Sequence, residues 1–151
     1  QAAGNGMTMP ILAGDTWDSN VITGAAQGKD VEIYVTTFYQ EGGNAEFDAA
    51  FKEWINSDSV NLENNGGNDM IAAVSVMGYD AYYVALEAIK AAGSADPAAV
   101  LAALPSVSYD GVTGNISFAD GAKDATRNVA FIKYCNTGTG VWDLIGEQGV
   151  E

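Results

Sequence analysis

The chain has 151 residues, which is the length of one domain with a sizeable core, and its 20 acidic and 6 basic residues give a formal net charge of −14 at pH 7. This balance excludes nucleic acid and anionic membrane surfaces as partners, because both require clusters of Lys and Arg. With no His and with Cys135 as the single cysteine, the chain cannot form an internal disulfide, a zinc site or a Cys–His nucleophile of its own.

Two targeting signals are also missing from the sequence. No run of about 18 apolar residues is present, so no membrane-spanning segment is predicted. Residues 1–6 lack the basic start and apolar middle of a signal peptide. If the protein is exported, we expect its leader to have been removed or to lie upstream.

The first predicted elements lie between residues 9 and 26. The apolar residues 11–13 predict a short buried strand, and residues 15–17 form the turn after it. Asp18 or Ser19 can cap the helix predicted over residues 20–26, since either side chain accepts a backbone N–H bond.

Asp15, Thr16 and Trp17 follow the carboxyl end of this strand, where ligands bind in open α/β sheets. A carboxylate neutralises an ammonium group, and the face of an indole ring attracts cations and offers a flat apolar wall. Asp15 beside Trp17 therefore favours a small ligand that carries an ammonium group. The alternative is that Asp15 is only a turn residue and Trp17 only a core residue.

The next segments alternate between regular elements and loops. Residues 31–38 are β-branched and aromatic and predict a strand. Residues 45–56, capped by Asn44, predict an amphipathic helix. Five of its side chains have the spacing of a core stripe: Phe47, Ala50, Phe51, Trp54 and Ile55. Residues 58–68 predict a solvated loop, because they lack the alternating ligands of an EF-hand calcium site.

Two further helices are predicted in the middle of the chain. The longer one runs from residue 70 or 71 to 92 and is apolar enough to be buried against a sheet. We expect Asp80 and Glu87 on this helix to face water. The shorter one follows a cap at Asp96 and ends at about residue 104.

The last part of the chain changes to a β pattern. It predicts a turn at residues 111–114, a strand at 115–118, a turn at Asp120-Gly121, and a hairpin of residues 129–134 and 140–145. The order β-α-β-α-α-α-β-β-β predicts an α/β fold that ends in a small antiparallel patch.

No motif of this sequence predicts catalysis. The chain has neither a G-x-S-x-G elbow nor a P-loop, and Gly111-x-x-Gly114 is too short for a dinucleotide fingerprint. Asp15 with Asp18 or Glu32 could form a glycosidase pair, but carboxylates around a helix cap are usually turn and cap residues. We therefore expect a protein that is not an enzyme and that has no cofactor or metal.

Five segments together resemble the later part of the type 1 periplasmic solute-binding proteins. They are PILAGDTWDS at 10–19, VEIYVTT at 31–37, GYDAY at 78–82, AIKAAG at 88–93 and YDGVTGNISF at 109–118. Their order and spacing over almost the whole chain carry the resemblance. The branch that the chain is most similar to is the branched-chain amino-acid (Leu, Ile, Val) receptors of ABC importers.

This resemblance implies an α/β fold of two Rossmann-like lobes that close on a ligand like a Venus flytrap. Members are longer than this chain, which corresponds to their C-terminal part. By analogy, residues 1–38 belong to the second lobe, residues 39–105 to the first lobe, and residues 107–151 return to the second lobe. The N-terminal segment, which supplies the groups that hold an amino acid's carboxylate, is not included.

The resemblance also implies a function and partners. The expected function is capture of a small polar ligand, an amino acid above all, for an ABC importer by hinge closure. The alternative is a ligand-sensing domain of a receptor or regulator with the same fold. Asp15 takes the position of the family's ammonium-binding acid, with Trp17 as a wall and Thr16 beside them.

The expected partners and location follow from the same resemblance. The partners are the ligand, the membrane permease, and either the missing N-terminal segment as a second chain or a second copy in an intertwined homodimer. Half of the fold leaves sheet edges and apolar faces uncovered, and such surfaces find partners. The location is periplasmic or extracellular, with a lipid anchor as an option.

Overall fold

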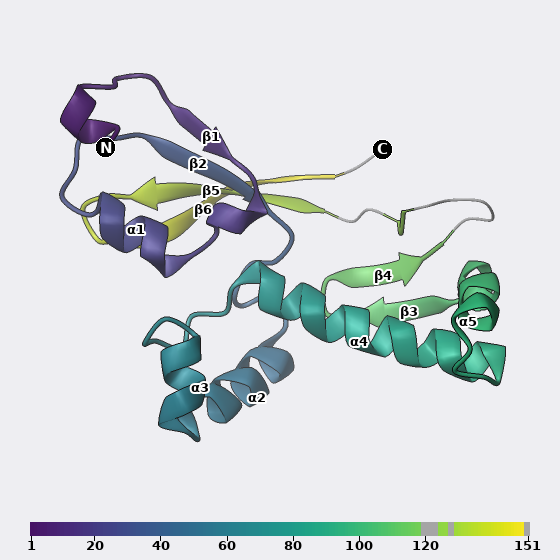
Figure 1. Ribbon diagram of the computed structural model, residues 1–151. Helices are drawn as coiled ribbons and strands as arrows, with labels where there is room; N and C mark the ends of the chain where they lie inside the picture. Colours follow the sequence, from purple (N-terminus) through teal and green to yellow (C-terminus); the bar gives the residue numbers. More distant parts are fainter. Residues whose placement is uncertain (119–123, 127–128, 150–151) are drawn as a thin grey trace. The chain divides into compact units, whose positions relative to one another are not determined.

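The computed structural model describes residues 1–118, 124–126 and 129–149 (Figure 1). The chain divides into two compact units. Unit 1 comprises residues 1–74 and 129–149, and the described part of unit 2 comprises residues 75–118 and 124–126. The turn predicted at Asp120-Gly121 lies outside the described residues.

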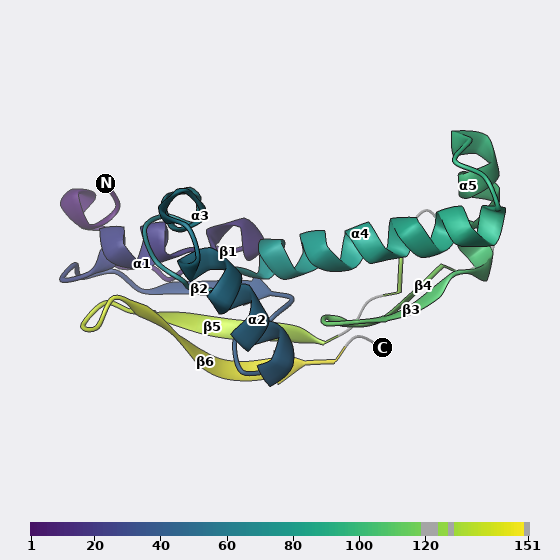
Figure 2. The ribbon, with the colours of Figure 1, turned by 90° about the horizontal axis from the view of Figure 1, so that it is seen from below.

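Unit 1 is built on a four-stranded sheet with the order β1-β2-β5-β6. Its strands are β1 (Ile11–Ala13), β2 (Ile33–Thr37), β5 (Ala130–Asn136) and β6 (Val141–Gln148). β1 pairs with β2 in parallel, and the pairs β2–β5 and β5–β6 are antiparallel. The predicted C-terminal hairpin is therefore confirmed, and Figures 1 and 2 show it as the long β5–β6 ribbon.

Unit 1 has two 3₁₀ turns and three α-helices, and each of these α-helices begins at a side-chain cap. They are the 3₁₀ turns η1 (Ala3–Asn5) and η2 (Asp15–Trp17) and the helices α1 (Asn20–Ala26), α2 (Ala45–Asn56) and α3 (Ser59–Asn64). Ser19 accepts from Val21 N at the start of α1, so Ser19 rather than Asp18 is the cap. Asn44 caps α2, as predicted.

Helix α3 contradicts the loop predicted over residues 58–68. The carboxylate of Asp58 accepts a hydrogen bond from Val60 N at 2.8 Å and so fixes the first turn. The side chain of Asn61 donates to Trp54 O of α2 at 3.1 Å, which holds α3 against its neighbour. The polar composition of the segment predicted a loop, but the cap at Asp58 and the contact of Asn61 stabilise a short helix there.

The core of unit 1 lies between α1 and one face of the sheet. Ala26, Ile33 and Cys135 are buried there, and Ile11, Ile22, Val31 and Trp142 pack around them. Burial raises the pKa of the Cys135 thiol. The prediction of a buried first strand is wrong for Leu12, which is 79% exposed, and Ile11 and Ala13 are only partly buried. Successive strand residues point to opposite faces, and α1 packs against only one of them.

The apolar stripe predicted on α2 is only partly core. Ile55 is fully buried, and the rings of Phe47 and Phe51 stack with centroids 5.5 Å apart. Trp54, by contrast, is 57% exposed, and Ala50 is also exposed. The described residues of unit 1 therefore cover only part of the apolar stripe.

Unit 2 combines a long helix with a small hairpin (Figure 2). Its elements are α4 (Ala73–Ala92, whose first two residues belong to unit 1), α5 (Pro97–Ala103), the 3₁₀ turn η3 (Leu104–Ser106), β3 (Ser108–Gly111) and β4 (Gly114–Ser117). Val84 and Ala88 of α4 form a core with Val107, Tyr109 and Ile116, so one side of the helix packs against the hairpin. The predicted burial is only partly confirmed, because large apolar side chains of its first half are 39–68% exposed: Val74, Met77, Tyr79 and Tyr82. Strand β3 was not predicted from the sequence. In the described part of the chain, no helix is long and apolar enough to cross a membrane.

Asp80 does not face water as predicted, because it is only 1% exposed. Its carboxylate accepts hydrogen bonds from Val112 N at 2.8 Å, Thr113 N at 2.8 Å and Thr113 Oγ1 at 2.7 Å. A Cβ at Gly111 would lie 2.7 Å from the carboxyl atoms of Asp80, so only glycine leaves room for this approach. Asp80 therefore fixes the β3–β4 turn to α4. Glu87, in contrast, forms an accessible ion pair with Lys90.

We expect Asp80→Asn to lower the free energy of unfolding by about 2–3 kcal/mol, because the amide nitrogen replaces one acceptor and leaves a buried N–H without a partner. Chemical denaturation followed by circular dichroism measures the change. Glu87→Gln on the same helix is the control and should cost less than about 0.5 kcal/mol. Equal effects of the two variants would contradict the role given to Asp80.

Candidate functional site

Asp15, Thr16 and Trp17 form η2, which begins two residues after β1 ends. Trp17 N donates to Gly14 O at 3.1 Å and Asp18 N donates to Asp15 O at 2.9 Å, so the backbone of this turn is fixed. Asp15 is half-buried, Thr16 is exposed and Trp17 is 38% exposed. No side chain among the described residues donates a hydrogen bond or forms an ion pair with the Asp15 carboxylate, which leaves it available to a ligand.

The apolar groove of unit 1 takes in only one of the three predicted residues. Trp17 lines an open groove of about 790 Å³ together with Ile11, Ile22 and Ile33 on α1 and the sheet. Asp15 and Thr16 do not belong to the lining of this groove. The pairing of Asp15 with Trp17 around one ligand thus stays a prediction.

A second polar centre lies next to this turn and was missed by sequence reasoning. The Nζ atom of Lys133 donates to both oxygens of Asp18, at 3.1 and 2.9 Å, and the side chains of this pair are 5% and 0% exposed. Thr37 Oγ1 donates to the same carboxylate at 2.7 Å. The pair joins residues 115 positions apart, so no local pattern in the sequence could have indicated it. Asp18 was instead considered as a cap.

Lys133 lines a cavity of about 350 Å³ inside unit 1. Residues from distant parts of the chain line this cavity: Asn20, Thr23, Gln40, Glu41, Asn68, Met70, Ile71, Lys133, Gly140, Val141 and Trp142. All three segments defined by the resemblance, 1–38, 39–105 and 107–151, contribute to it.

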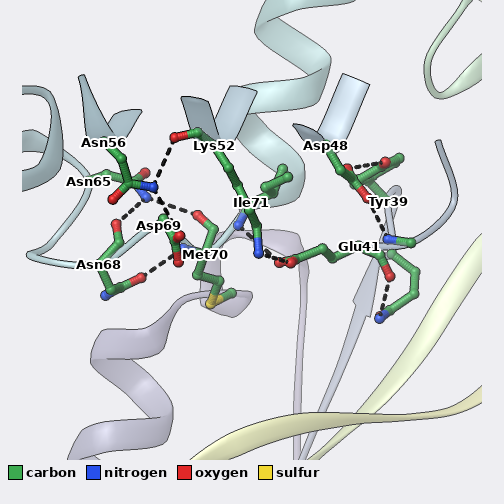
Figure 3. Close-up of polar contacts among 12 residues, drawn as sticks. Tyr39, Glu41, Asp48, Lys52, Asn56, Asn65, Asn68, Asp69, Met70 and Ile71 are labelled. Carbon is green, nitrogen blue, oxygen red and sulfur yellow. Dashed lines mark hydrogen bonds and ion pairs between the residues drawn. The ribbon is translucent and has the colours of Figure 1, made fainter. Parts of the chain in front are cut away.

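A network of polar contacts holds one wall of this cavity (Figure 3). Glu41 forms an ion pair with Lys52 of α2 and accepts a long bond of 3.4 Å from Ile71 N. The hydrogen bond with Glu41 raises the pKa of the Lys52 ammonium. The charge of the wall residue Glu41 is therefore neutralised by Lys52, and its side chain is bound to the segment that carries Ile71.

Asp48 fixes the segment just before and after Glu41. It accepts from Tyr39 Oη and from Gly42 N, each at 2.6 Å (Figure 3). Burial, together with the bond to Asp48, raises the pKa of the Tyr39 hydroxyl. Residues 39–42 are thus anchored to α2 at both ends, which positions Gln40 and Glu41 in the wall.

The chain matches the model of a family described as periplasmic binding protein over residues 1–139. Among solved structures it is similar to the leucine binding protein LivK from Thermotoga maritima, with 27% sequence identity and a TM-score of 0.65. The match covers 99% of this chain and 40% of that protein, so the chain spans less than half of its length. The search of curated proteins found no match.

A double-mutant cycle tests the energetics of the Asp18–Lys133 pair. We expect Lys133→Met to lower the free energy of unfolding by about 3–5 kcal/mol, because it leaves the Asp18 carboxylate buried without its cation. Adding Asp18→Asn should restore part of this loss. A double variant that is no more stable than Lys133→Met, measured by urea denaturation, would contradict the pairing.

Proposed function

The chain belongs to the periplasmic binding protein family, and from this premise we propose that it captures an amino acid for an ABC importer. The type 1 binding-protein fold predicted from the sequence is confirmed by the family match and by the similarity to LivK, and the chain represents part of that domain. Proteins of this family bind ligands without catalysis, in agreement with the absence of a catalytic motif.

In the proposed site, the carboxylate of Asp15 neutralises the ammonium group of the amino acid. One observation carries this assignment: Asp15 stands just beyond the carboxyl end of β1, only half-buried, and no described side chain is bound to its carboxylate. Ligands of α/β sheets bind at such ends. The partly exposed ring of Trp17 offers an apolar wall and Thr16 a hydroxyl on the same turn.

The proposed mechanism is hinge closure between two lobes. A ligand that contacts both lobes binds the closed state better and shifts the open–closed equilibrium toward it. Residues 1–38 and 107–151 would belong to the second lobe and residues 39–105 to the first. The support for this arrangement is the match of the chain to the periplasmic binding protein family. The closed form would dock on the membrane permease from the periplasmic or extracellular side, free or held by a lipid anchor.

We further propose that the chain is completed by another polypeptide, either an N-terminal segment as a second chain or a second copy in an intertwined homodimer. The support is the apolar surface that unit 1 leaves open. Leu12 on the edge strand β1 is 79% exposed, and Trp54 on α2 is 57% exposed. Exposed edges and large apolar side chains of this kind are typical of interfaces.

The amino-acid site is tested by substituting Asp15 in the longest natural form of the protein. We expect Asp15→Asn to weaken the binding of L-leucine about 30- to 150-fold, which corresponds to about 2–3 kcal/mol for a lost charge-assisted bond. Isothermal titration calorimetry measures the affinity. Asp30→Asn, which changes an exposed carboxylate of unit 1, is the control. Equal affinities of both variants would show that Asp15 does not hold the ligand.

The completion proposal is tested on the 151-residue chain alone. We expect size-exclusion chromatography with light scattering to detect dimers or larger species, because the exposed apolar surface is covered by self-association. Replacing Leu12 and Trp54 by Gln should shift the chain toward the monomer. A monodisperse wild-type monomer that melts cooperatively would contradict the proposal.

A further inference from the structure

The turn that carries Asp15 is attached to the sheet through one side chain, the carboxylate of Asp18. Asp18 ends η2, and its backbone N–H donates to Asp15 O at 2.9 Å. Its carboxylate accepts from Thr37 Oγ1 of β2 at 2.7 Å and from Lys133 Nζ of β5 at 2.9 Å. A single backbone hydrogen bond therefore separates Asp15 from a residue that two strands hold.

The two carboxylates of this turn have different surroundings. Asp15 is half-buried, and none of the described side chains is bound to its carboxylate. The side chain of Asp18, by contrast, is 0% exposed and accepts hydrogen bonds from both of its partners. A buried carboxylate that loses such partners is strongly destabilising, so Asp18 keeps its place. One carboxylate is thus available to a ligand, and the other anchors the turn.

The far end of the same turn is held by a third strand. Trp142 Nε1 of β6 donates to Ser19 O at 3.3 Å, and Ser19 N donates to Trp17 O at 2.8 Å. A group that binds a ligand must be kept within about 0.5 Å of its productive position by supporting contacts of this kind. The contacts around Asp18 and Ser19 give the turn such support.

We propose that Thr37 and Lys133 are positioning residues for the Asp15 site, which act through Asp18 without contacting the ligand. They hold Asp18 on the sheet, Asp18 holds the backbone of Asp15, and Asp15 presents its carboxylate to the ammonium group of the ligand. This inference rests on the proposed function, because it assigns both residues to the same site.

Thr37→Val is the variant that isolates this role. Valine has nearly the same shape as threonine, so the substitution removes the hydroxyl that donates to Asp18 and changes no charge. Lys133→Met is less informative, because it removes a positive charge near a site for a cationic group and also leaves Asp18 buried without its cation.

We expect Thr37→Val, in the longest natural form of the protein, to weaken the binding of L-leucine about three- to thirtyfold. This range corresponds to the coupling measured within one hydrogen-bond network. Isothermal titration calorimetry measures the affinity. Thr37→Ser keeps the hydroxyl and should restore wild-type affinity. Thr36→Val makes the same substitution at an exposed neighbour on β2 and should bind like the wild type.

A double-mutant cycle with Asp15→Asn separates a positioning role from a merely structural one. If Thr37 acts through Asp15, Thr37→Val should change the affinity of the Asp15→Asn protein by less than about twofold. Asp80→Asn disturbs the buried carboxylate of unit 2 and is the control for lost stability. It should bind L-leucine like the wild type.

The outcomes distinguish this inference from the proposed function. Wild-type affinity of Thr37→Val overturns the positioning role, and so does an equal loss in Asp80→Asn or in the Asp15→Asn background. The proposed site stands in each of these cases as long as Asp15→Asn weakens binding. Wild-type affinity of Asp15→Asn shows that the proposed site is wrong, and the positioning role is then overturned with it.

Discussion

The burial of the Asp18 carboxylate is the constraint on which the rest of unit 1 depends. This side chain is fully buried, and a carboxylate in that position is stable only with a cation and hydrogen-bond donors around it. Lys133 of β5 and Thr37 of β2 supply them. The pair, together with Thr37, thereby fixes the turn after β1 to two neighbouring strands.

Unit 2 also contains a buried carboxylate, but its hydrogen-bond partners are uncharged groups. Asp80 is as deeply buried as Asp18, but its partners are two backbone N–H groups and a hydroxyl instead of a cation. Donors from one turn suffice because they converge on the carboxylate. In both units a buried acidic side chain connects a helix or turn to strands that are distant in sequence, so long-range polar contacts define each core as much as apolar packing does.

The regular elements were predictable where local chemistry decides them. The caps Asn44 and Asp96 and the β-branched run of β2 gave correct elements, whereas α3 was missed because its signal is a single cap at Asp58. The resemblance of five ordered segments correctly identified the family. The errors at Asp80 and Leu12 have one cause: exposure depends on which other elements pack nearby, and residue type alone does not state this.

The candidate site was predictable only in its local part. Asp15 and Trp17 stand out because a strand, a turn and a cap follow one another within a few residues. Lys133 carries no such mark, since its pairing with Asp18 comes from the fold, which brings β5 beside the turn after β1. A local pattern can therefore place a side chain at the end of a strand, but the partner that neutralises a buried charge is set by the pairing of strands that are distant in sequence.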